Sequence, residues 1–178
     1  MPGVFIVVSG LPASGKTTIG RSVARELGFG CIDKDDILES LFDSLGCNSP
    51  ARCTELSRAS DGVKAKLAEE ANNVVLVSFW KTPATRQGGT PASWIPGTFE
   101  RVIELHCCCS PEVAARRFVA RKRHPGHFDA ERSLTGCIES FIELSRDGAL
   151  GIGALLSLNT SDEVVLPGAF DGWVGRTD

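Results

Sequence analysis

Four residues near the start of the chain, Gly10, Gly15, Lys16 and Thr17, stand at the fixed positions of the pattern G-x-x-x-x-G-K-[ST]. Glycines there let backbone N–H groups turn inward around phosphate oxygens, at the positive end of the helix that follows. Lys16 adds a mobile positive charge, and the hydroxyl of Thr17 suits a magnesium ion. The loop therefore predicts binding of a nucleoside triphosphate. The residues expected to contact it are Gly10, Ala13, Ser14, Gly15, Lys16, Thr17 and Thr18.

The segments on either side of this loop fit the same interpretation. Residues 4–9 form a continuous apolar run rich in β-branched side chains, which is typical of a strand buried on both faces. After the loop, Ile19, Val23 and Leu27 recur at helical spacing, and Gly28 follows as a stop signal. Strand, loop and helix in this order favour the phosphate-binding loop over its alternative, a glycine-rich turn with no ligand.

Two aspartates, Asp33 and Asp35, follow a short apolar stretch at residues 30–33 that we expect to be the second strand. In open parallel sheets ligands bind beyond the carboxyl ends of the strands, and alternate side chains of an extended segment share one side. Both carboxylates should therefore face the phosphate loop. Phosphoryl transfer to an alcohol needs a group that accepts the hydroxyl proton and an acid that holds magnesium-bound water. We assign Asp35 to the first role and Asp33 to the second; the alternative is that Asp35 or Asp36 only caps the helix over residues 37–45.

A third group of candidates lies on an arginine-rich helix. Ser110-Pro111-Glu112 has the residue types of a helix start, and His124-Pro125-Gly126-His127 ends the helix sharply, as a hinged lid around residues 112–130 would require. Arginine stabilises charge on a transferring phosphoryl group without changing its own protonation. The catalytic candidates on this helix are Arg117, Arg121 and Arg123, while Arg116 and Lys122 complete its basic set. The alternative is a solvated helix face.

Apolar strands alternate with helical patterns along the rest of the chain, which predicts one α/β domain over residues 1–178. We expect a mainly parallel five-stranded sheet with helices on both faces, its later strands near residues 74–80, 101–107 and 154–158. A helix over 53–71 should turn Leu56, Val63 and Leu67 inward, and another over 130–146 is supported by Leu134, Ile138, Phe141 and Ile142.

The segment from Lys81 to Thr98 breaks this alternation with three prolines and three glycines, so a long regular helix is not expected there. A loop of this length either covers a substrate or is a disordered insertion. The side chains in it with the reach to touch a ligand are Arg86, Gln87 and Trp94.

Composition limits the partners and the cellular setting. The 178 residues carry 19 lysines and arginines against 22 acids, a formal charge of −3, which disfavours a nucleic-acid partner. With no leader and no membrane-length apolar stretch, we expect a cytoplasmic protein without a membrane partner. The seven cysteines form no paired C-x-x-C array, which disfavours a metal held by thiols, and His106, inside a predicted strand, is expected to be a packed, hydrogen-bonded histidine.

Taken together, the loop at residues 10–18, the stretch Asp33 to Asp36 and the arginine helix resemble the small P-loop kinases. That superfamily includes shikimate, gluconate and adenylylsulfate kinases, chloramphenicol phosphotransferase and the kinase domain of polynucleotide kinase. The resemblance implies a nucleoside-monophosphate-kinase-like fold, with Asp33 serving magnesium and Asp35 the accepting hydroxyl. It places the adenine contact near Asn159, Thr160 and Ser161. One departure is Ser78, where many P-loop proteins have an acid.

These features predict a kinase that uses ATP and Mg²⁺ to phosphorylate a hydroxyl of a small molecule, with the acceptor and the oligomeric state left open. Lys16 and the lid arginines would stabilise the transferred group, and Thr17 and Asp33 would support the metal. A polynucleotide 5′-hydroxyl kinase is the alternative that the order Lys34-Asp35-Asp36 favours. A nucleotide-binding switch that transfers nothing is the alternative that Ser78 favours.

Overall fold

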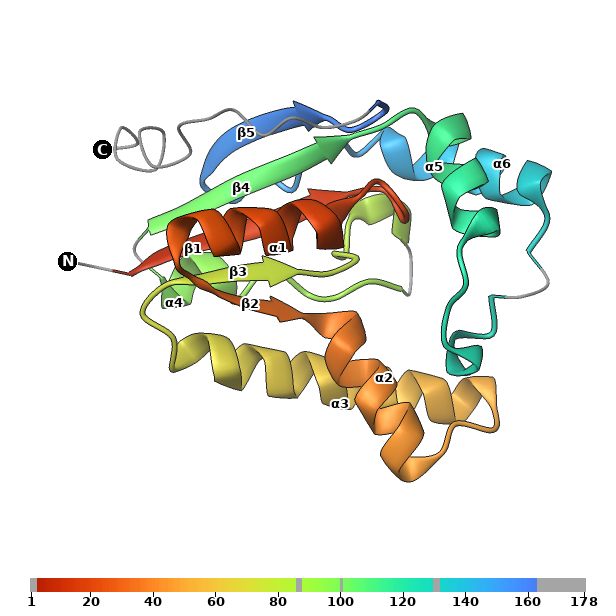
Figure 1. Cartoon of the computed structure of the whole chain (residues 1–178), viewed down its shortest axis with the longest axis horizontal. Coiled ribbons are helices and arrows are strands. Elements are labelled where there is room, and N and C mark those ends of the chain that lie inside the picture. The colour runs from red at the N-terminus through yellow and green to blue at the C-terminus, as the bar shows by residue number, and fades with distance from the viewer. Residues whose placement is uncertain (1–2, 86–87, 100, 130–131, 163–178) are drawn as a thin grey trace.

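The computed structural model describes residues 3–85, 88–99, 101–129 and 132–162, and its centre is a five-stranded sheet. The strands are β1 (Val4–Gly10), β2 (Gly30–Asp33), β3 (Val74–Val77), β4 (Arg101–Cys108) and β5 (Ala154–Asn159). They run in the order β2-β3-β1-β4-β5, and every neighbouring pair is parallel (Figure 1). The predicted five-stranded parallel sheet is therefore confirmed.

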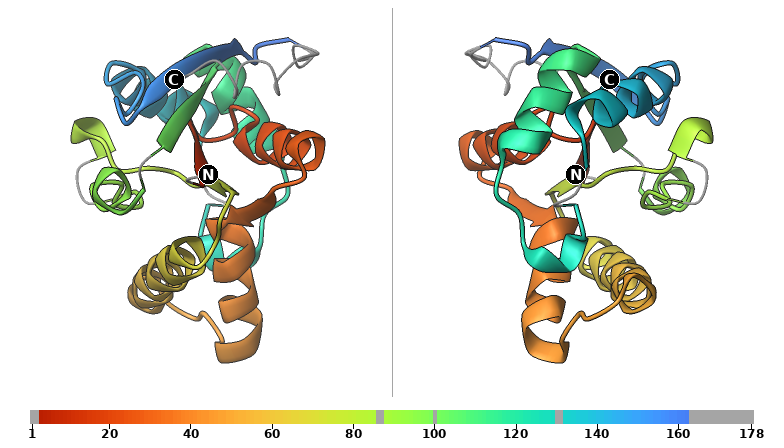
Figure 2. Two further views of the ribbon diagram at one scale, coloured as in Figure 1. Left: turned by 90° about the vertical axis from the view of Figure 1, so that its left-hand side faces the viewer. Right: turned by 90° about the vertical axis from the view of Figure 1, so that its right-hand side faces the viewer.

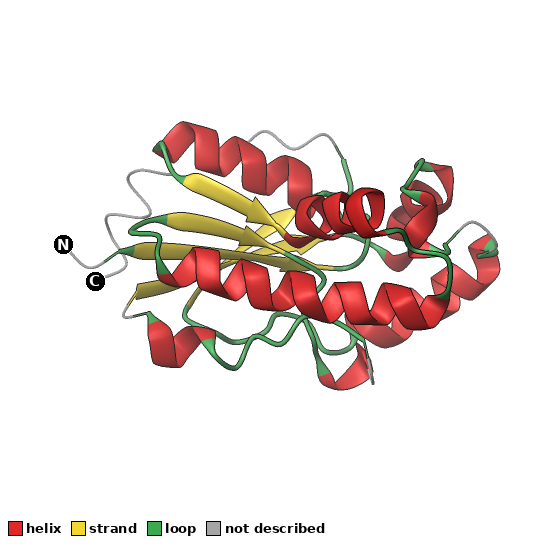
Figure 3. Cartoon of the chain, turned by 90° about the horizontal axis from the view of Figure 1, so that it is seen from below, coloured by secondary structure: helices red, strands yellow, loops and turns green. Residues whose placement is uncertain are grey.

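The helices cover both faces of this sheet (Figure 3). They are α1 (Lys16–Leu27), α2 (Lys34–Leu45), α3 (Pro50–Glu69), α4 (Ile95–Thr98), α5 (Pro111–Ala120) and α6 (Leu134–Ser145), with short 3₁₀ turns at η1 (Pro83–Thr85) and η2 (Pro125–His127). Helix α1 packs Ile19 and Val23 on one face, while α3 and α4 contribute Ala68 and Ile95 to the other (Figure 2). Because β1 and β3 lie between these layers, their apolar runs are buried on both sides.

Helix α3 differs from the prediction in its start and in its buried face. It begins at Pro50, with the side chain of Ser49 as its cap, rather than near Cys53. Val63 and Leu67, which we expected inward, are 44% and 51% exposed. The buried row instead repeats every four residues, through Leu56, Ser60, Lys64 and Ala68. Two of its members are polar, so hydrophobicity alone does not reveal this face.

The arginine-rich segment is also shorter as a helix than predicted. Helix α5 ends at Ala120, and Arg121 already has extended backbone angles. Arg121 and Arg123, which we predicted on this helix, therefore lie beyond its end, and that part of the prediction is wrong. The chain continues through η2 towards α2, from which it is far removed in sequence (Figure 1).

Two further boundaries differ from the prediction. Helix α6 begins at Leu134 after a Ser133 cap, not at Ala130, and residues 130–131 lie outside the described part of the chain. Of its four predicted apolar contacts, Phe141 and Ile138 pack inward, whereas Leu134 and Ile142 are 41% and 39% exposed. Strand β3 ends at Val77 instead of Trp80, and Trp80 forms an isolated bridge with Thr90 instead of a ladder with the sheet.

The segment from Lys81 to Thr98 pairs with the residues that follow β3, in the part that the structure describes. Thr90 N donates to Phe79 O at 2.7 Å, and Lys81 N donates to Thr90 O at 2.8 Å. Trp94 packs edge-on against Phe99 and is half-buried, and its contact with a ligand stays a prediction. Arg86 and Gln87 lie outside the described residues. None of the described helices is long and apolar enough to cross a membrane.

Candidate active site

A cleft of about 830 Å³ opens beyond the carboxyl ends of β1, β2 and β3, where the fold predicts a ligand. The phosphate loop forms one wall, and the start of α2 forms another. The chain from α5 to Asp129 encloses the opposite side, together with Thr160. The cleft thus brings the three predicted groups of residues into one site.

The N-terminus of α1 is built to receive an anion. Its N-cap, Gly15, has a left-handed φ of 93° and offers no side-chain cap, although side chains cap α2, α3, α5 and α6. The N–H groups of Lys16, Thr17 and Thr18 have no acceptor within the helix, because no turn precedes them whose carbonyl oxygens could accept their hydrogen bonds. Ala13 also has a left-handed φ, 59°, a strained conformation that such sites often contain. These groups fit phosphate oxygens.

Lys16 lies folded back along this loop. Its Nζ donates to the carbonyl oxygens of Leu11 at 2.7 Å and Gly10 at 3.1 Å, and the side chain is buried. Burial lowers the pKa of the Lys16 ammonium from 10.5 to about 8. An arriving phosphate would give the ammonium a negative partner in place of neutral carbonyls, which strengthens the charged form.

Thr17 and Asp33 meet at the end of β2, as predicted. Thr17 Oγ1 donates to Asp33 Oδ2 at 2.7 Å, so the lone pairs of the hydroxyl oxygen stay available. Burial raises the pKa of the Asp33 carboxyl, although the hydrogen bonds from Thr17 and from the N–H of Asp35 oppose the shift. A hydroxyl and a carboxylate are hard oxygen donors of the kind that Mg²⁺ prefers, so the residues present fit this ion.

The cap of α2 is Asp33 rather than Asp35 or Asp36. Asp33 Oδ1 accepts the N–H of Asp35 at 3.0 Å, because the last residue of the strand already has the extended angles that a cap adopts. The predicted geometry of two carboxylates on one extended segment is therefore wrong, since Asp35 lies inside the helix. Its side chain still lines the cleft, with no capping role. Asp36 points elsewhere and pairs with Arg21 at 2.8 Å.

Arg123 reaches Asp35 although the two lie 88 residues apart in the sequence. Its Nη2 donates to Asp35 Oδ2 at 2.7 Å, and its Nη1 donates to Asp129 Oδ2. One guanidinium thus joins two carboxylates of the cleft. Asp35 Oδ1 accepts no hydrogen bond from the described residues, and the carboxylate is 48% exposed towards the cleft.

The segment that carries Arg123 is docked on α2. His124 Nε2 lies 3.0 Å from Asp43 Oδ1, and His127 Nε2 lies 2.8 Å from Glu39 Oε1. Gly126 packs so close to Phe42 that a Cβ at this position would stand 2.5 Å from the ring. These contacts hold the segment against α2, beside which it lies in Figure 1.

The two remaining candidate arginines have different surroundings. Arg117 donates to the carbonyl oxygens of Thr160 at 2.6 Å and Ser161 at 2.8 Å, so it anchors the turn after β5. Arg121 lines the cleft and stacks on the Phe118 ring at 4.7 Å, without an acidic partner among the described residues. Burial lowers the pKa of Arg121, and the nearby Arg123 adds to the effect.

The predicted adenine contacts are only partly in position. Thr160 lines the cleft, and its hydroxyl donates to Cys108 O at 3.0 Å. Asn159 is not part of the wall, because its side chain accepts the N–H of Ser161 and closes the turn locally. Its predicted contact with the nucleotide is not supported by this geometry.

Two residues of the site were missed from the sequence. Lys34 is buried beside the cleft, where its Nζ donates to Ser57 Oγ at 2.7 Å and lies 3.3 Å from Asp61. In the sequence, the position of Lys34 between Asp33 and Asp35 was the feature that could have indicated its place in the site. Asp129, the second partner of Arg123, carries no sequence signal of its own. Within the described chain no three histidine, cysteine or acidic side chains form a metal site.

The comparison with family models identifies residues 5–136 as an AAA domain, the family AAA_33. This range contains the phosphate loop, both aspartates and all three candidate arginines, and it is well over half of the chain. Among curated proteins, the cytidylate kinase of Pyrobaculum calidifontis is 30% identical over 124 residues. The match spans 66% of this chain but only 60% of that kinase, so the two proteins are similar over part of their lengths.

Solved structures share the whole fold. A protein of Chloroflexus aurantiacus that is provisionally classed as a kinase superposes with a TM-score of 0.78 and 22% identity, covering 99% of both chains. Shikimate kinase from Bacteroides thetaiotaomicron superposes with a TM-score of 0.59 and 22% identity, covering 97% of this chain and 95% of its own. The chain belongs to the AAA domain family and has the fold of the small-molecule P-loop kinases.

Proposed function

We propose that this protein transfers the γ-phosphoryl group of ATP to a hydroxyl of a small molecule. The observation that carries the proposal is the position of Asp35, a cleft carboxylate held through one oxygen by Arg123 and available through the other. A group so placed orients an acceptor hydroxyl opposite the phosphate loop. The relatives named above support a kinase, and the alcohol as acceptor is the further step that Asp35 supports.

The donor side is supported by the loop and by α1. The N–H groups at the start of the helix bind the β- and γ-phosphates, and Lys16 moves from the loop carbonyls to the phosphate oxygens. Thr17 and Asp33 would hold the magnesium ion, directly and through bound water. When bound, the ion would supply positive charge that offsets the negative charge developing during transfer.

On the acceptor side, Asp35 Oδ1 accepts the hydroxyl proton as the oxygen attacks phosphorus. Arg123 fixes the direction of the carboxylate, because its fork of donors also holds Asp129. The attacking oxygen, phosphorus and the leaving oxygen of ADP are then in line between Asp35 and the loop.

Arg121 is the lid arginine best suited to the transferred group. It lines the cleft without a carboxylate partner among the described residues, whereas Arg123 and Arg117 are already engaged. Its guanidinium would stabilise charge on the equatorial phosphoryl oxygens. Arg117 would act on the nucleotide through the turn at Thr160.

The two alternatives have less support. A polynucleotide kinase would use the first aspartate of Lys34-Asp35-Asp36 as its base, which is again Asp35, so the argument against it is the formal charge of −3, which disfavours a nucleic-acid partner. A non-catalytic switch leaves the available oxygen of Asp35 without a function. Neither alternative has an observation of its own in the described residues.

Acceptor-stimulated release of ADP tests the proposal. Purified protein with ATP and Mg²⁺ is screened against sugars, nucleosides, hydroxylated antibiotics, nucleoside monophosphates and oligonucleotides, and the products are identified by mass spectrometry. The proposal expects a phosphate ester of one small alcohol, which Lys16→Ala abolishes. Phosphorylation of a nucleoside monophosphate on its phosphate would show that the acceptor is a phosphate group and not an alcohol. A lack of response to every acceptor would favour the switch.

A further inference from the structure

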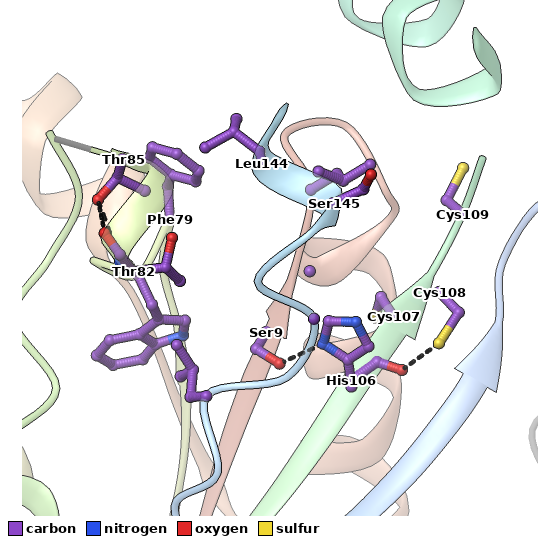
Figure 4. A pocket seen from close by; sticks show the side chains of 15 residues that line it. Ser9, Phe79, Thr82, Thr85, His106, Cys107, Cys108, Cys109, Leu144 and Ser145 are labelled. Carbon is purple, nitrogen blue, oxygen red and sulfur yellow. Dashed lines mark hydrogen bonds between the residues drawn. The ribbon is translucent and has the colours of Figure 1, made fainter. Parts of the chain in front are cut away.

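A second cavity, of about 220 Å³, lies beside the first residues of the phosphate loop (Figure 4). Its walls come from the end of β1, the end of β4, the chain after β3 with η1, and the end of α6. Phe79 borders both this cavity and the main cleft, but the two aspartates and the lid arginines border only the cleft. The proposed kinase reaction therefore makes no use of the second cavity.

A buried carboxylate begins a chain of hydrogen bonds that ends in this cavity. Glu104 is fully buried in β4, and its oxygens accept the N–H groups of Leu150 at 2.7 Å and Gly151 at 2.9 Å. Glu104 Oε1 also accepts the hydroxyl proton of Ser9 at 2.5 Å. Because a serine hydroxyl has one proton, Ser9 Oγ can act only as an acceptor towards any further partner.

That further partner is the Nδ1 atom of His106, at 2.8 Å from Ser9 Oγ. Nδ1 must therefore carry the ring proton. In the neutral ring, Nε2 is then an acceptor with a free lone pair. Burial lowers the pKa of the His106 imidazole below its usual value, so the neutral ring is present at pH 7. Figure 4 shows this ring among the lining side chains, with Ser9 against one of its edges.

Apolar and polar side chains share the walls around this acceptor, the polar ones being Thr82, Thr85, Ser145 and three cysteines. Leu11, Trp80, Leu144 and Leu150 line the cavity, and the Trp80 indole N–H is already taken by Val8 O at 2.8 Å. Nε2 of His106 has no partner among the described residues. A cavity of about 150 Å³ with apolar walls accepts a benzene molecule, so a space of about 220 Å³ has room for one substituted ring.

We propose that this cavity binds a compact ring compound with a single hydroxyl or N–H donor, which donates to His106 Nε2. The ring would replace water against Phe79 and Leu144, and the hydrogen bond would set its orientation. The bound molecule would also touch Gly10 and Leu11, the residues whose carbonyls hold Lys16. The site does not depend on the proposed kinase activity.

Phenol and anisole are the probes that test this proposal, since both fit as one ring and only phenol donates. NMR titration of the ¹⁵N-labelled protein should show both at the cavity, with phenol bound about fivefold more tightly through its hydrogen bond. The ¹⁵N resonance of His106 Nε2 should move with phenol alone. Equal affinities, or binding of neither probe, would overturn the proposal.

Variants separate the hydrogen bond from the shape of the cavity. His106→Phe keeps an aromatic ring but removes the acceptor, so phenol should bind only as well as anisole does. Leu144→Trp should fill the space and weaken both probes, with folding checked by thermal melting. Asp35→Asn, in the main cleft, should leave both affinities unchanged. Full retention of the preference for phenol in His106→Phe would also refute the role of Nε2.

Discussion

Lys64 provides a quantitative test of how this fold is held together. The side chain belongs to the buried row of α3 and has no exposed surface. Its Nζ lies 3.7 Å from the centroid of the Trp80 ring and makes no hydrogen bond in the described part of the chain. The nearest acid, Asp61, is already engaged by Lys34 and Thr90. Burial therefore lowers the pKa of the Lys64 ammonium from 10.5 to about 7.

The pKa shift of Lys64 determines how much the buried amine lowers the stability of the fold and how this loss changes with pH. Below pH 7 the folded protein holds a charged amine at a cost of about 5 kcal/mol, because 3.5 pKa units separate the folded from the unfolded state. Between pH 7 and 10.5 the unfolded chain binds this proton and the folded protein does not, so stability rises with pH. Lys64→Met removes this charge, and the pKa shift already contains the attraction of the ammonium to the Trp80 ring. We therefore expect a gain of about 5 kcal/mol at pH 6.

Urea unfolding of both proteins at pH 6 and pH 9 measures this. The extra stability of Lys64→Met over the wild type should be about 3 kcal/mol smaller at pH 9 than at pH 6. The reason is that pH 9 lies 2 units above the folded pKa of about 7. The control is Lys66→Met, on the same helix but exposed, which should leave stability nearly unchanged. A variant that is less stable at pH 6, or a difference that is constant with pH, would refute the reasoning.

Three further predictions concern the cleft. Affinity for an ATP analogue should fall as the pH rises through about 8, where Lys16 loses its proton in the free protein, and isothermal titration should detect proton uptake on binding above that pH. Affinity that is constant to pH 9.5 would contradict this. Gly126→Val should push the lid away from Phe42 and raise hydrogen exchange over residues 121–129, whereas unchanged exchange would show that the close contact does not hold the lid. Arg121→Ala should lower kcat by about 10²-fold. Arg117→Ala should mainly raise the KM for ATP, and the reverse pattern would exchange their roles.

The sequence predicted the elements whose signals are local. Strand β1, the loop and α1 follow one another within 24 residues, and each is marked by its own pattern of apolar or glycine residues. Gly28 ends α1 in the left-handed conformation that a glycine stop requires, with a φ of 67°. These features need no information from the rest of the chain.

The features that were missed depend on contacts between distant residues. Arg123 and Asp35 are 88 residues apart, and the path between them is set by the contact of Gly126 with Phe42. Nothing near Arg121 indicates that the helix ends before it. The prediction of the α2 cap was wrong for a different reason. The three aspartates at positions 33, 35 and 36 have the same propensity to cap a helix, and only the end of β2 selects Asp33.

The central claim is that Asp35 receives the proton of an alcohol during phosphoryl transfer, and a pair of adjacent variants tests it most directly. Asp35→Asn and Asp36→Asn make the same chemical change on neighbouring residues, one in the cleft and one paired with Arg21 outside it. With the acceptor found in the screen, Asp35→Asn should lower kcat by about 10²- to 10⁴-fold while retaining ATP binding, and Asp36→Asn should match the wild type. Full turnover by Asp35→Asn would contradict the account.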